Sequence, residues 1–235
     1  MSDARGGGRT PFCGAAYTRV VPETHQWLGR LGGRFIVFDG PDGSGKSTQL
    51  RRFLEACGRT SLRVCEVREP GGTSIGERIR EILLDRVHDE MTVRCEMLLY
   101  MASRAQLVEE RIRPALVRGE CVVADRFVSS TMAYQGTAGG LGLESIAEVG
   151  LIATRDLSPD VVVVFDVDAD AASRRLSPLL DRMEAKGRAF HERVREGYLE
   201  QARRWPGQYL VIDASGDEES VWSSLMSRLR ERFDG

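Results

Sequence analysis

The stretch Phe35-Ile-Val-Phe-Asp-Gly40-Pro-Asp-Gly-Ser-Gly45-Lys46-Ser47-Thr48 contains the pattern G-x-x-x-x-G-K-[ST]. The apolar residues 35–38 predict a buried strand before the glycines, and residues 49–56 have the apolar spacing of a helix. A glycine-rich turn is the alternative interpretation, but a strand on one side and a helix on the other are the context in which this pattern binds the phosphates of a nucleotide.

The residue types of this loop suit a nucleoside triphosphate. Glycines bring backbone N–H groups close to phosphate oxygens, and the start of the following helix adds unpaired N–H groups. Lys46 supplies a positive charge for the β- and γ-phosphates, and the hydroxyl of Ser47 can reach Mg²⁺. Only Lys46 and Lys186 are lysines among 33 basic residues, so a chain that otherwise uses arginine has lysine here. The predicted nucleotide-binding residues are Gly40, Asp42, Gly43, Ser44, Gly45, Lys46, Ser47 and Thr48.

Composition is typical of one globular α/β domain that works in the cytoplasm. The chain has 235 residues, 42% hydrophobic and 29% charged, and a net charge of −2, which favours no nucleic-acid partner. No apolar run approaches the ~20 residues that would span a membrane. The five cysteines form no C-x-x-C pair, which indicates reduced thiols, and three distant histidines offer no zinc site.

Five apolar segments alternate with helical patterns after a glycine-rich beginning. Residues 1–33 are predicted to be a flexible N-terminal extension without an assigned role, and residues 34–235 one domain. Alternating strands and helices predict a parallel sheet flanked by helices, with ligands at the carboxyl ends of the strands. A long helical pattern at 91–117 contains Pro114, which should kink or split it. The predicted strands are 35–38, 62–67, 121–124, 160–166 and 209–212.

Four further motifs follow the loop in order. They are Arg68-Glu-Pro-Gly-Gly-Thr73, Tyr100-Met-Ala-Ser-Arg104, Asp125-Arg126-Phe127 and Tyr134-Gln135-Gly136. With the loop, they resemble the thymidylate kinase family of P-loop nucleoside monophosphate kinases over residues 34–233. The resemblance implies a three-layer α/β P-loop kinase fold with a parallel five-stranded sheet and a helical lid segment at about 172–188. It also implies transfer of the γ-phosphoryl group of ATP to dTMP with Mg²⁺, giving dTDP for dTTP synthesis, in a homodimer.

Arg126 is the first candidate for the acceptor site. An arginine at the end of a strand can fork onto a phosphate, although a solvated side chain or an ion pair with Asp125 would explain it equally from the residues alone. In the family that the chain resembles, the matching arginine holds the monophosphate, and Asp125 falls where a carboxylate associated with Mg²⁺ would lie. Arg80 matches a second arginine on the acceptor phosphate, or is a charge on a helix surface.

Tyr100 and Arg104 are candidates for contacts to the base. They lie four residues apart and therefore on one face of a helix. A core tyrosine and a surface arginine are the plain alternative, but the resemblance implies an aromatic ring stacked on thymine and an arginine bonded to its O4. Thr131 and Gln135 are placed as further base contacts.

The sugar contacts follow from the resemblance as well. Tyr134 matches the residue that crowds the 2′ position and so prefers deoxyribose, and Asp42 matches an acid that bonds the 3′-hydroxyl. Without the resemblance, Asp42 would be a solvated carboxylate of the loop.

The family places its catalytic arginine either in the phosphate loop or in the lid. The variable loop positions here are Pro41, Asp42, Gly43 and Ser44, so the lid must supply it. Ser177 stands where relatives of the lid type often have arginine, which is a departure. Arg182 is the favoured candidate, with Arg175 beside it; an Arg-rich solvated helix is the alternative.

Two other functional classes remain open from the sequence. Another nucleoside or nucleotide kinase would share the donor loop but not the base contacts. A phosphate-loop regulatory NTPase would bind a protein partner, although the N-K-x-D motif of GTPases is excluded because the chain contains no asparagine. An inactive homologue is a third reading, motivated by Ser177.

Overall fold

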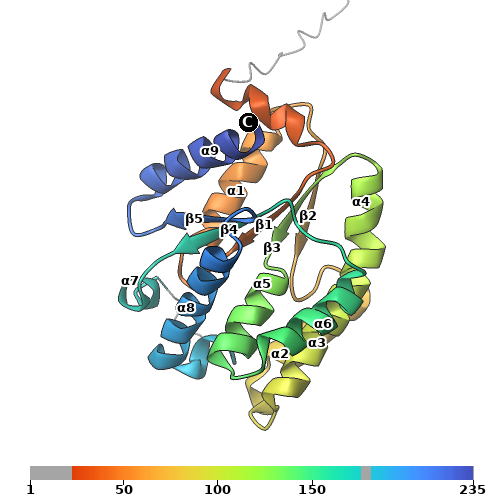
Figure 1. Cartoon of the computed structure of the whole chain (residues 1–235), viewed down its shortest axis with the longest axis vertical. Coiled ribbons are helices and arrows are strands. Elements are labelled where there is room, and N and C mark those ends of the chain that lie inside the picture. Colours follow the sequence, from red (N-terminus) through yellow and green to blue (C-terminus); the bar gives the residue numbers. More distant parts are fainter. Residues whose placement is uncertain (1–22, 176–180, 235) are drawn as a thin grey trace, which may run out of the picture.

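A five-stranded parallel sheet forms the centre of the computed structural model, which describes residues 23–175 and 181–234 (Figure 1). The spatial order is β2-β3-β1-β4-β5, and every neighbouring pair is parallel. The predicted α/β fold with this sheet is therefore confirmed. The strands are β1 (Phe35–Asp39), β2 (Val64–Arg68), β3 (Cys121–Asp125), β4 (Val161–Asp166) and β5 (Tyr209–Asp213).

The strand order determines where a ligand can bind. β1 lies in the middle, with β2 and β3 on one side and β4 and β5 on the other, so the chain crosses from one side of β1 to the other between β3 and β4. A crevice forms at such a switch point, at the carboxyl ends of the strands. The strands β1, β3 and β4 end in Asp39, Asp125 and Asp166, which places three carboxylates at this edge of the sheet.

Helices cover both faces of the sheet, which makes the three layers visible in Figure 1. On one face, Ile36 and Phe38 pack with residues of α1, α9 and the short helix η1. On the other, Phe35 and Val37 pack with residues of α3, η3, η4 and α8. The longer helices are α1 (Lys46–Cys57), α2 (Ser74–Leu84), α3 (Val93–Leu107), α6 (Leu143–Thr154), α8 (Arg188–Arg204) and α9 (Glu218–Asp234). The shorter ones are η1 (Glu23–Leu31), η2 (Arg86–His88), η3 (Val108–Ile112), α4 (Arg113–Val117), α5 (Val128–Thr131), η4 (Met132–Ala138), α7 (Ala169–Ser173) and η5 (Glu184–Lys186).

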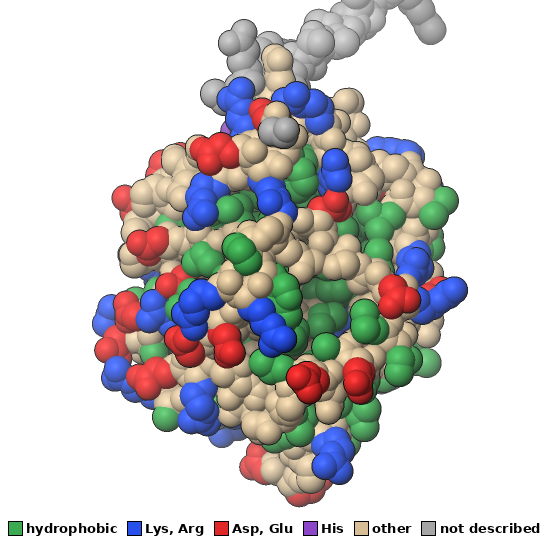
Figure 2. All heavy atoms as spheres, viewed as in Figure 1, with side chains coloured by type: hydrophobic (Ala, Val, Ile, Leu, Met, Phe, Trp, Pro, Cys, Tyr) green, Lys and Arg blue, Asp and Glu red, His purple; other side chains and the backbone are tan. Residues whose placement is uncertain are grey.

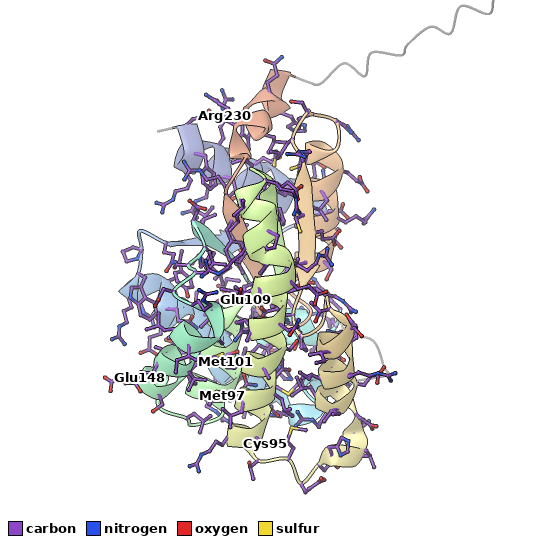
Figure 3. The ribbon with its side chains drawn as sticks, turned by 90° about the vertical axis from the view of Figure 1, so that its right-hand side faces the viewer. Cys95, Met97, Met101, Glu109, Glu148 and Arg230 are labelled. Atoms are coloured by element: carbon purple, nitrogen blue, oxygen red, sulfur yellow. The ribbon has the colours of Figure 1, made fainter. Side chains whose placement is uncertain are left out.

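The long helix predicted over 91–117 is divided, as its proline suggested. α3 passes into the wider, π-helical turn η3 and then into α4, whose first turn contains Pro114. A proline is tolerated in the first turn because its missing N–H has no partner there. Figure 3 shows α3 facing the viewer, with Met97 and Met101 labelled; they pack with Met132 and Ile146 of neighbouring segments.

The first described helix, η1, belongs to the folded body. Trp27, Leu28 and Leu31 are buried in the same cluster as β1 and α1. The sequence predicted that the domain begins at residue 34, but these three residues already pack in its core. Burying three large apolar side chains offsets the entropy that is lost when the segment is ordered. Residues 1–22, the rest of the predicted extension, lie outside the described part of the chain, as do residues 176–180 of the predicted lid. Of the helices that are described, none combines the length and apolar character needed to cross a membrane.

We expect Leu28→Ala to lower the free energy of unfolding by about 2–5 kcal/mol, because Leu28 is completely buried. Ile152→Ala is the control, since Ile152 is 78% exposed, and should change stability by less than about 0.5 kcal/mol. Urea titration of both variants measures the difference. Equal stability of Leu28→Ala and the unmodified chain would show that η1 is not part of the core.

Candidate active site

Residues 40–45 form the loop between β1 and α1, and residues 46–48 belong to the first turn of α1; together they border a cavity of about 510 Å³. Gly43 and Gly45 have φ values of 77° and 80°, which other residues rarely adopt. A Cβ on Gly43 would also clash with the carbonyl oxygen of Ala172. Gly40 does not line the cavity; instead its backbone lies against β4, where a Cβ would be 2.6 Å from the carbonyl oxygen of Phe165. The lining residues are Pro41, Asp42, Gly43, Ser44, Gly45, Lys46, Ser47, Thr48, Arg126, Arg175 and Glu184.

Lys46 is a buried cation at the start of α1. Its ammonium group donates a hydrogen bond to the carboxylate of Asp125 at the end of β3. Burial and the nearby Arg126 lower the pKa of Lys46, while Asp125 acts in the opposite direction. The lysine is therefore positioned by a carboxylate within the cavity that an anionic phosphate would enter.

Arg126 follows directly on β3 in a left-handed conformation, with φ at 71°. A non-glycine residue in this region is uncommon and is typical of functional sites. One guanidinium nitrogen donates to Ser130 at 3.2 Å and Tyr198 at 3.1 Å, and the other pairs with Asp42 of the phosphate loop. The predicted alternative of an ion pair with Asp125 is not found, because Asp125 pairs with Lys46.

Asp39, at the end of β1, holds this arrangement together and was not predicted from the sequence. Its carboxylate is completely buried. It accepts hydrogen bonds from Ser129 at 2.6 Å, Ser130 at 2.7 Å and Tyr198 at 2.5 Å, and lies 3.4 Å from Arg126. A buried carboxylate with this many donors fixes the groups around it. Its position at the strand end was a signal for the site, whereas nothing in the local sequence marked Tyr198.

A second cavity, of about 200 Å³, opens beside the loop. It brings together seven of the predicted acceptor residues: Asp42, Arg80, Tyr100, Arg126, Thr131, Tyr134 and Gln135. Lys46, Glu69, Pro70, Leu84, Ser130, Asp181, Met183 and Glu184 complete the lining. Arg80 donates to the carbonyl oxygen of Pro70 at 3.0 Å and contributes to this wall.

Arg104 is the predicted acceptor residue that does not line this cavity. It is 1% exposed and lies behind the wall, where its Nη2 is 2.6 Å from a carboxylate oxygen of Glu69. Another bond, of 3.2 Å, reaches the hydroxyl of Thr131. Burial raises the pKa of Glu69 to about 7 in spite of Arg104. In this structure Arg104 therefore orients Thr131 and Glu69, which do line the cavity.

Tyr134 and Asp42 meet in the lining of the second cavity. The hydroxyl of Tyr134 donates to Asp42 at 2.7 Å, and its ring lies 5.2 Å from the guanidinium of Arg126. Burial raises the pKa of Asp42, but Arg126, Tyr134 and Lys46 outweigh burial and hold it below its ordinary value. A carboxylate of the phosphate loop is thus joined directly to the acceptor wall.

The two cavities share four residues: Asp42, Lys46, Arg126 and Glu184. A ligand on the phosphate loop and a ligand in the second cavity would therefore meet beside Lys46 and Arg126. Both of these residues are positively charged, as the transfer of a group between two anions requires.

The two candidate lid arginines lie in different places. Arg175 lines the phosphate cavity and donates to the carbonyl oxygen of Ala214 at 3.1 Å. Arg182 is buried away from the loop, pairs with Glu96 of α3 at 2.7 Å, and donates to the carbonyl oxygen of Leu83 at 2.8 Å. Arg175, rather than the favoured Arg182, therefore lines the phosphate cavity. Ser177 lies outside the described residues.

Comparison with known proteins agrees with this geometry. The model of a family described as Thymidylate kinase matches residues 38–225. Similar proteins include a thymidylate kinase of Desulforudis audaxviator, 45% identical over 208 residues that cover 86% of this chain and 94% of the relative. The thymidylate kinase of Caldanaerobacter subterraneus subsp. tengcongensis is 44% identical over 204 residues, covering 86% and 98%.

This chain belongs to the thymidylate kinase family. A crystal structure of thymidylate kinase from Ehrlichia chaffeensis has the same fold, with a TM-score of 0.67 and 30% identity over 84% of this chain and 98% of that one. The resemblance noted in the sequence is therefore confirmed, and the kinase fold with it. Each candidate site residue named above, from Asp39 to Tyr198, lies within the range that the family model matches.

Proposed function

We propose that this thymidylate kinase family member transfers the γ-phosphoryl group of ATP to dTMP, giving ADP and dTDP for dTTP synthesis. The observation that supports this most is the junction of the two cavities at Asp42, Lys46 and Arg126. The phosphate cavity is bordered by the glycine-rich loop, whose backbone N–H groups suit a triphosphate. The second cavity is lined by two tyrosines and two arginines, which suit the base and the phosphate of a nucleoside monophosphate.

The donor lies on the phosphate loop. A third cavity, of about 310 Å³, is lined by Gly45 and Thr48 of the loop and by Ala214 and Gly216 after β5. We place the adenine of ATP in this third cavity. Arg175 borders both this cavity and the phosphate cavity, so its charge is available to the transferring group.

Mg²⁺ fits the oxygen donors near the loop. Ser47 is exposed in the phosphate cavity, and Asp125 lies beside Lys46. Among the described residues, no group of three or more acidic, histidine or cysteine side chains is arranged so that it could hold a metal ion by itself. Mg²⁺ bound to a nucleotide needs only one or two protein oxygens besides phosphates and water. The ion, when bound, would neutralise charge on the phosphates; Ser47 and Asp125 would hold it.

The acceptor occupies the second cavity. Arg126 and Arg80 bind its phosphate, Tyr100 packs on the base, and Thr131 and Gln135 offer hydrogen bonds to the base edge. Tyr134 would crowd a 2′-hydroxyl and so favour deoxyribose, as the resemblance implies. An oxygen of the dTMP phosphate then attacks the γ-phosphorus of ATP while the bond to the β-phosphate oxygen breaks, and ADP leaves. Positioning and charge neutralisation carry this reaction, because no covalent enzyme intermediate is required.

Two further parts of the proposal concern the protein's surroundings. We propose a homodimer, supported by apolar side chains exposed on α2 and α3: Ile75 and Ile82 are 58% and 43% exposed, and Leu98 is 49% exposed. Figure 3 shows α3 facing the viewer, with Cys95 labelled at its lower end. We also place the enzyme in the cytoplasm, because Cys57, Cys65, Cys95 and Cys121 are free thiols.

Figure 2 shows charges of both signs interspersed over the face in view, which favours a small-molecule substrate over nucleic acid.

ADP release measured for dTMP, dAMP, dCMP and dGMP should be fastest with dTMP. Lys46→Ala is the control for the donor side: it should reduce transfer by at least about 100-fold, because it removes the cation at the phosphates. Binding of dTMP to this variant should change far less. Preferred turnover of another nucleotide would indicate a different nucleotide kinase, and hydrolysis that depends only on a protein partner would indicate a regulatory NTPase.

We expect Arg175→Met to lower kcat by about 100-fold while the thermal midpoint stays unchanged, since the side chain is exposed at the phosphate cavity. Arg182→Met should instead destabilise the protein by about 3–5 kcal/mol, because it leaves Glu96 with one cation fewer in the interior. Steady-state kinetics and thermal unfolding of both variants distinguish the roles. A collapse of kcat in Arg182→Met alone, with normal stability, would contradict this assignment.

A further inference from the structure

Glu96 is a buried carboxylate on α3 at which three segments of the chain meet. It is 1% exposed and lies one helical turn before Tyr100. Gln135 of η4 donates its Nε2 to one carboxylate oxygen at 2.7 Å. Arg182 contacts the other oxygen at 2.7 Å, and the ammonium group of Lys186 lies 3.0–3.1 Å from both.

Both cations come from the described end of the predicted lid segment. Arg182 is also tied to the end of α2, because its Nε donates to the carbonyl oxygen of Leu83 and its backbone N–H to that of Leu84. These carbonyls are at a helix C-terminus, where a cation is favourable. Glu96 and the end of α2 therefore hold residues 182–186 against the acceptor cavity.

The bond from Gln135 has a consequence for the base pocket. A carboxylate only accepts hydrogen bonds, so the amide of Gln135 must turn its NH₂ group toward Glu96. None of the hydrogen bonds among described residues ends on Oε1 of Gln135. Since Gln135 lines the acceptor cavity, Oε1 is the amide atom left for a base.

We propose that Glu96 is a positioning residue that joins base selection to docking of the lid segment. It fixes the amide of Gln135 so that the cavity presents a carbonyl oxygen, and it binds Arg182 and Lys186 through the same carboxylate. This inference rests on the proposed function, and it concerns a residue that itself touches no substrate.

The expected selectivity follows from hydrogen-bond polarity. A pyrimidine with a ring N–H at position 3, such as thymine, can donate to the carbonyl oxygen of Gln135. Cytosine has an unprotonated ring nitrogen there, so two acceptors would face each other. A site whose polar group is fixed rejects the wrong partner more strongly than one whose group can turn.

Glu96→Gln tests the proposal in the full-length protein. The new amide can offer either its oxygen or its NH₂ group, so Gln135 is free to turn. The ratio of kcat/KM for dTMP to that for dCMP should fall about tenfold, the size of one misdirected hydrogen bond. Protection of peptides covering residues 182–188 from hydrogen exchange should fall in the same variant.

Glu109→Gln is the matched control. Glu109 lies in η3, which directly follows α3, and is labelled in Figure 3. It pairs with Arg113 and Arg155 on the surface. Like Glu96→Gln, this substitution removes a carboxylate that has two basic partners, but Glu109 does not border the acceptor cavity. Its dTMP/dCMP ratio and lid protection should equal those of the unmodified chain.

The double variant Glu96→Gln/Gln135→Ala tests whether Glu96 acts on base selection through Gln135. If Glu96 selects the base through Gln135, adding Glu96→Gln to Gln135→Ala should cause no further loss of the ratio, while lid protection should still fall. A normal ratio in folded Glu96→Gln, or additive losses in the double variant, would overturn the proposal.

Lys186→Met keeps the test decisive if Glu96→Gln does not fold, because the Lys186 side chain is 23% exposed. It should lower the hydrogen-exchange protection of residues 182–188, because Glu96 loses one of its two cationic partners. The ratio of kcat/KM for dTMP to that for dCMP should fall by about threefold, because a less firmly held carboxylate fixes Gln135 less firmly. No change in either quantity would refute the link.

If the unmodified protein does not phosphorylate dTMP, the proposed function fails; if it does and these variants select normally, this inference fails alone.

Discussion

The active site depends on one buried interaction, the hold of Asp39 on the guanidinium of Arg126. Asp39 ends the central strand, and its carboxylate organises Ser129, Ser130 and Tyr198 around the arginine. A second carboxylate, Asp42 of the phosphate loop, pairs with the same guanidinium. Arg126 is thereby fixed in a left-handed backbone conformation at the junction of the donor and acceptor cavities. Pre-organising a charge in this way removes the cost of ordering it when two anionic substrates meet.

The remainder of the fold places groups around this junction. Parallel pairing of β1 with β3 and β4 brings Asp39, Asp125 and the phosphate loop to one edge of the sheet. Lys46 can therefore pair with Asp125, although 79 residues separate them in the sequence, and it lies beside Arg126, which follows Asp125. α3 supplies the wall of the acceptor cavity on one side and buries Glu96 and Arg104 beneath it. Most charged groups near the cavities are paired with one another, which explains how a small chain tolerates this many charges in its interior.

Sequence reasoning succeeded where a function is encoded by neighbouring residues. The loop at 40–48, the five apolar strands and seven residues that line one cavity could be named because each depends on local spacing or on an ordered motif. The binding roles of these seven residues stay predictions. Sequence reasoning did not reach Tyr198, whose bond to Asp39 spans 159 residues, because the packing of α8 decides that contact. Arg104 shares a helix face with Tyr100, yet it reaches Glu69 and is covered, so helical spacing alone could not place it. The choice between Arg175 and Arg182 likewise depended on Glu96, which no motif marked. Trp27, Leu28 and Leu31 were hidden by the glycine-rich residues around them.

The most direct measurement of the central claim compares the binding of dTMP and thymidine to the unmodified chain and to Arg126→Met by titration calorimetry. The two ligands differ only in the phosphate that Arg126 is held to receive. The account predicts that Arg126→Met weakens dTMP binding by about 10- to 100-fold, the range for hydrogen bonds to charged groups, and leaves thymidine binding nearly unchanged. Equal weakening of both ligands, or an unchanged affinity for dTMP, would contradict it.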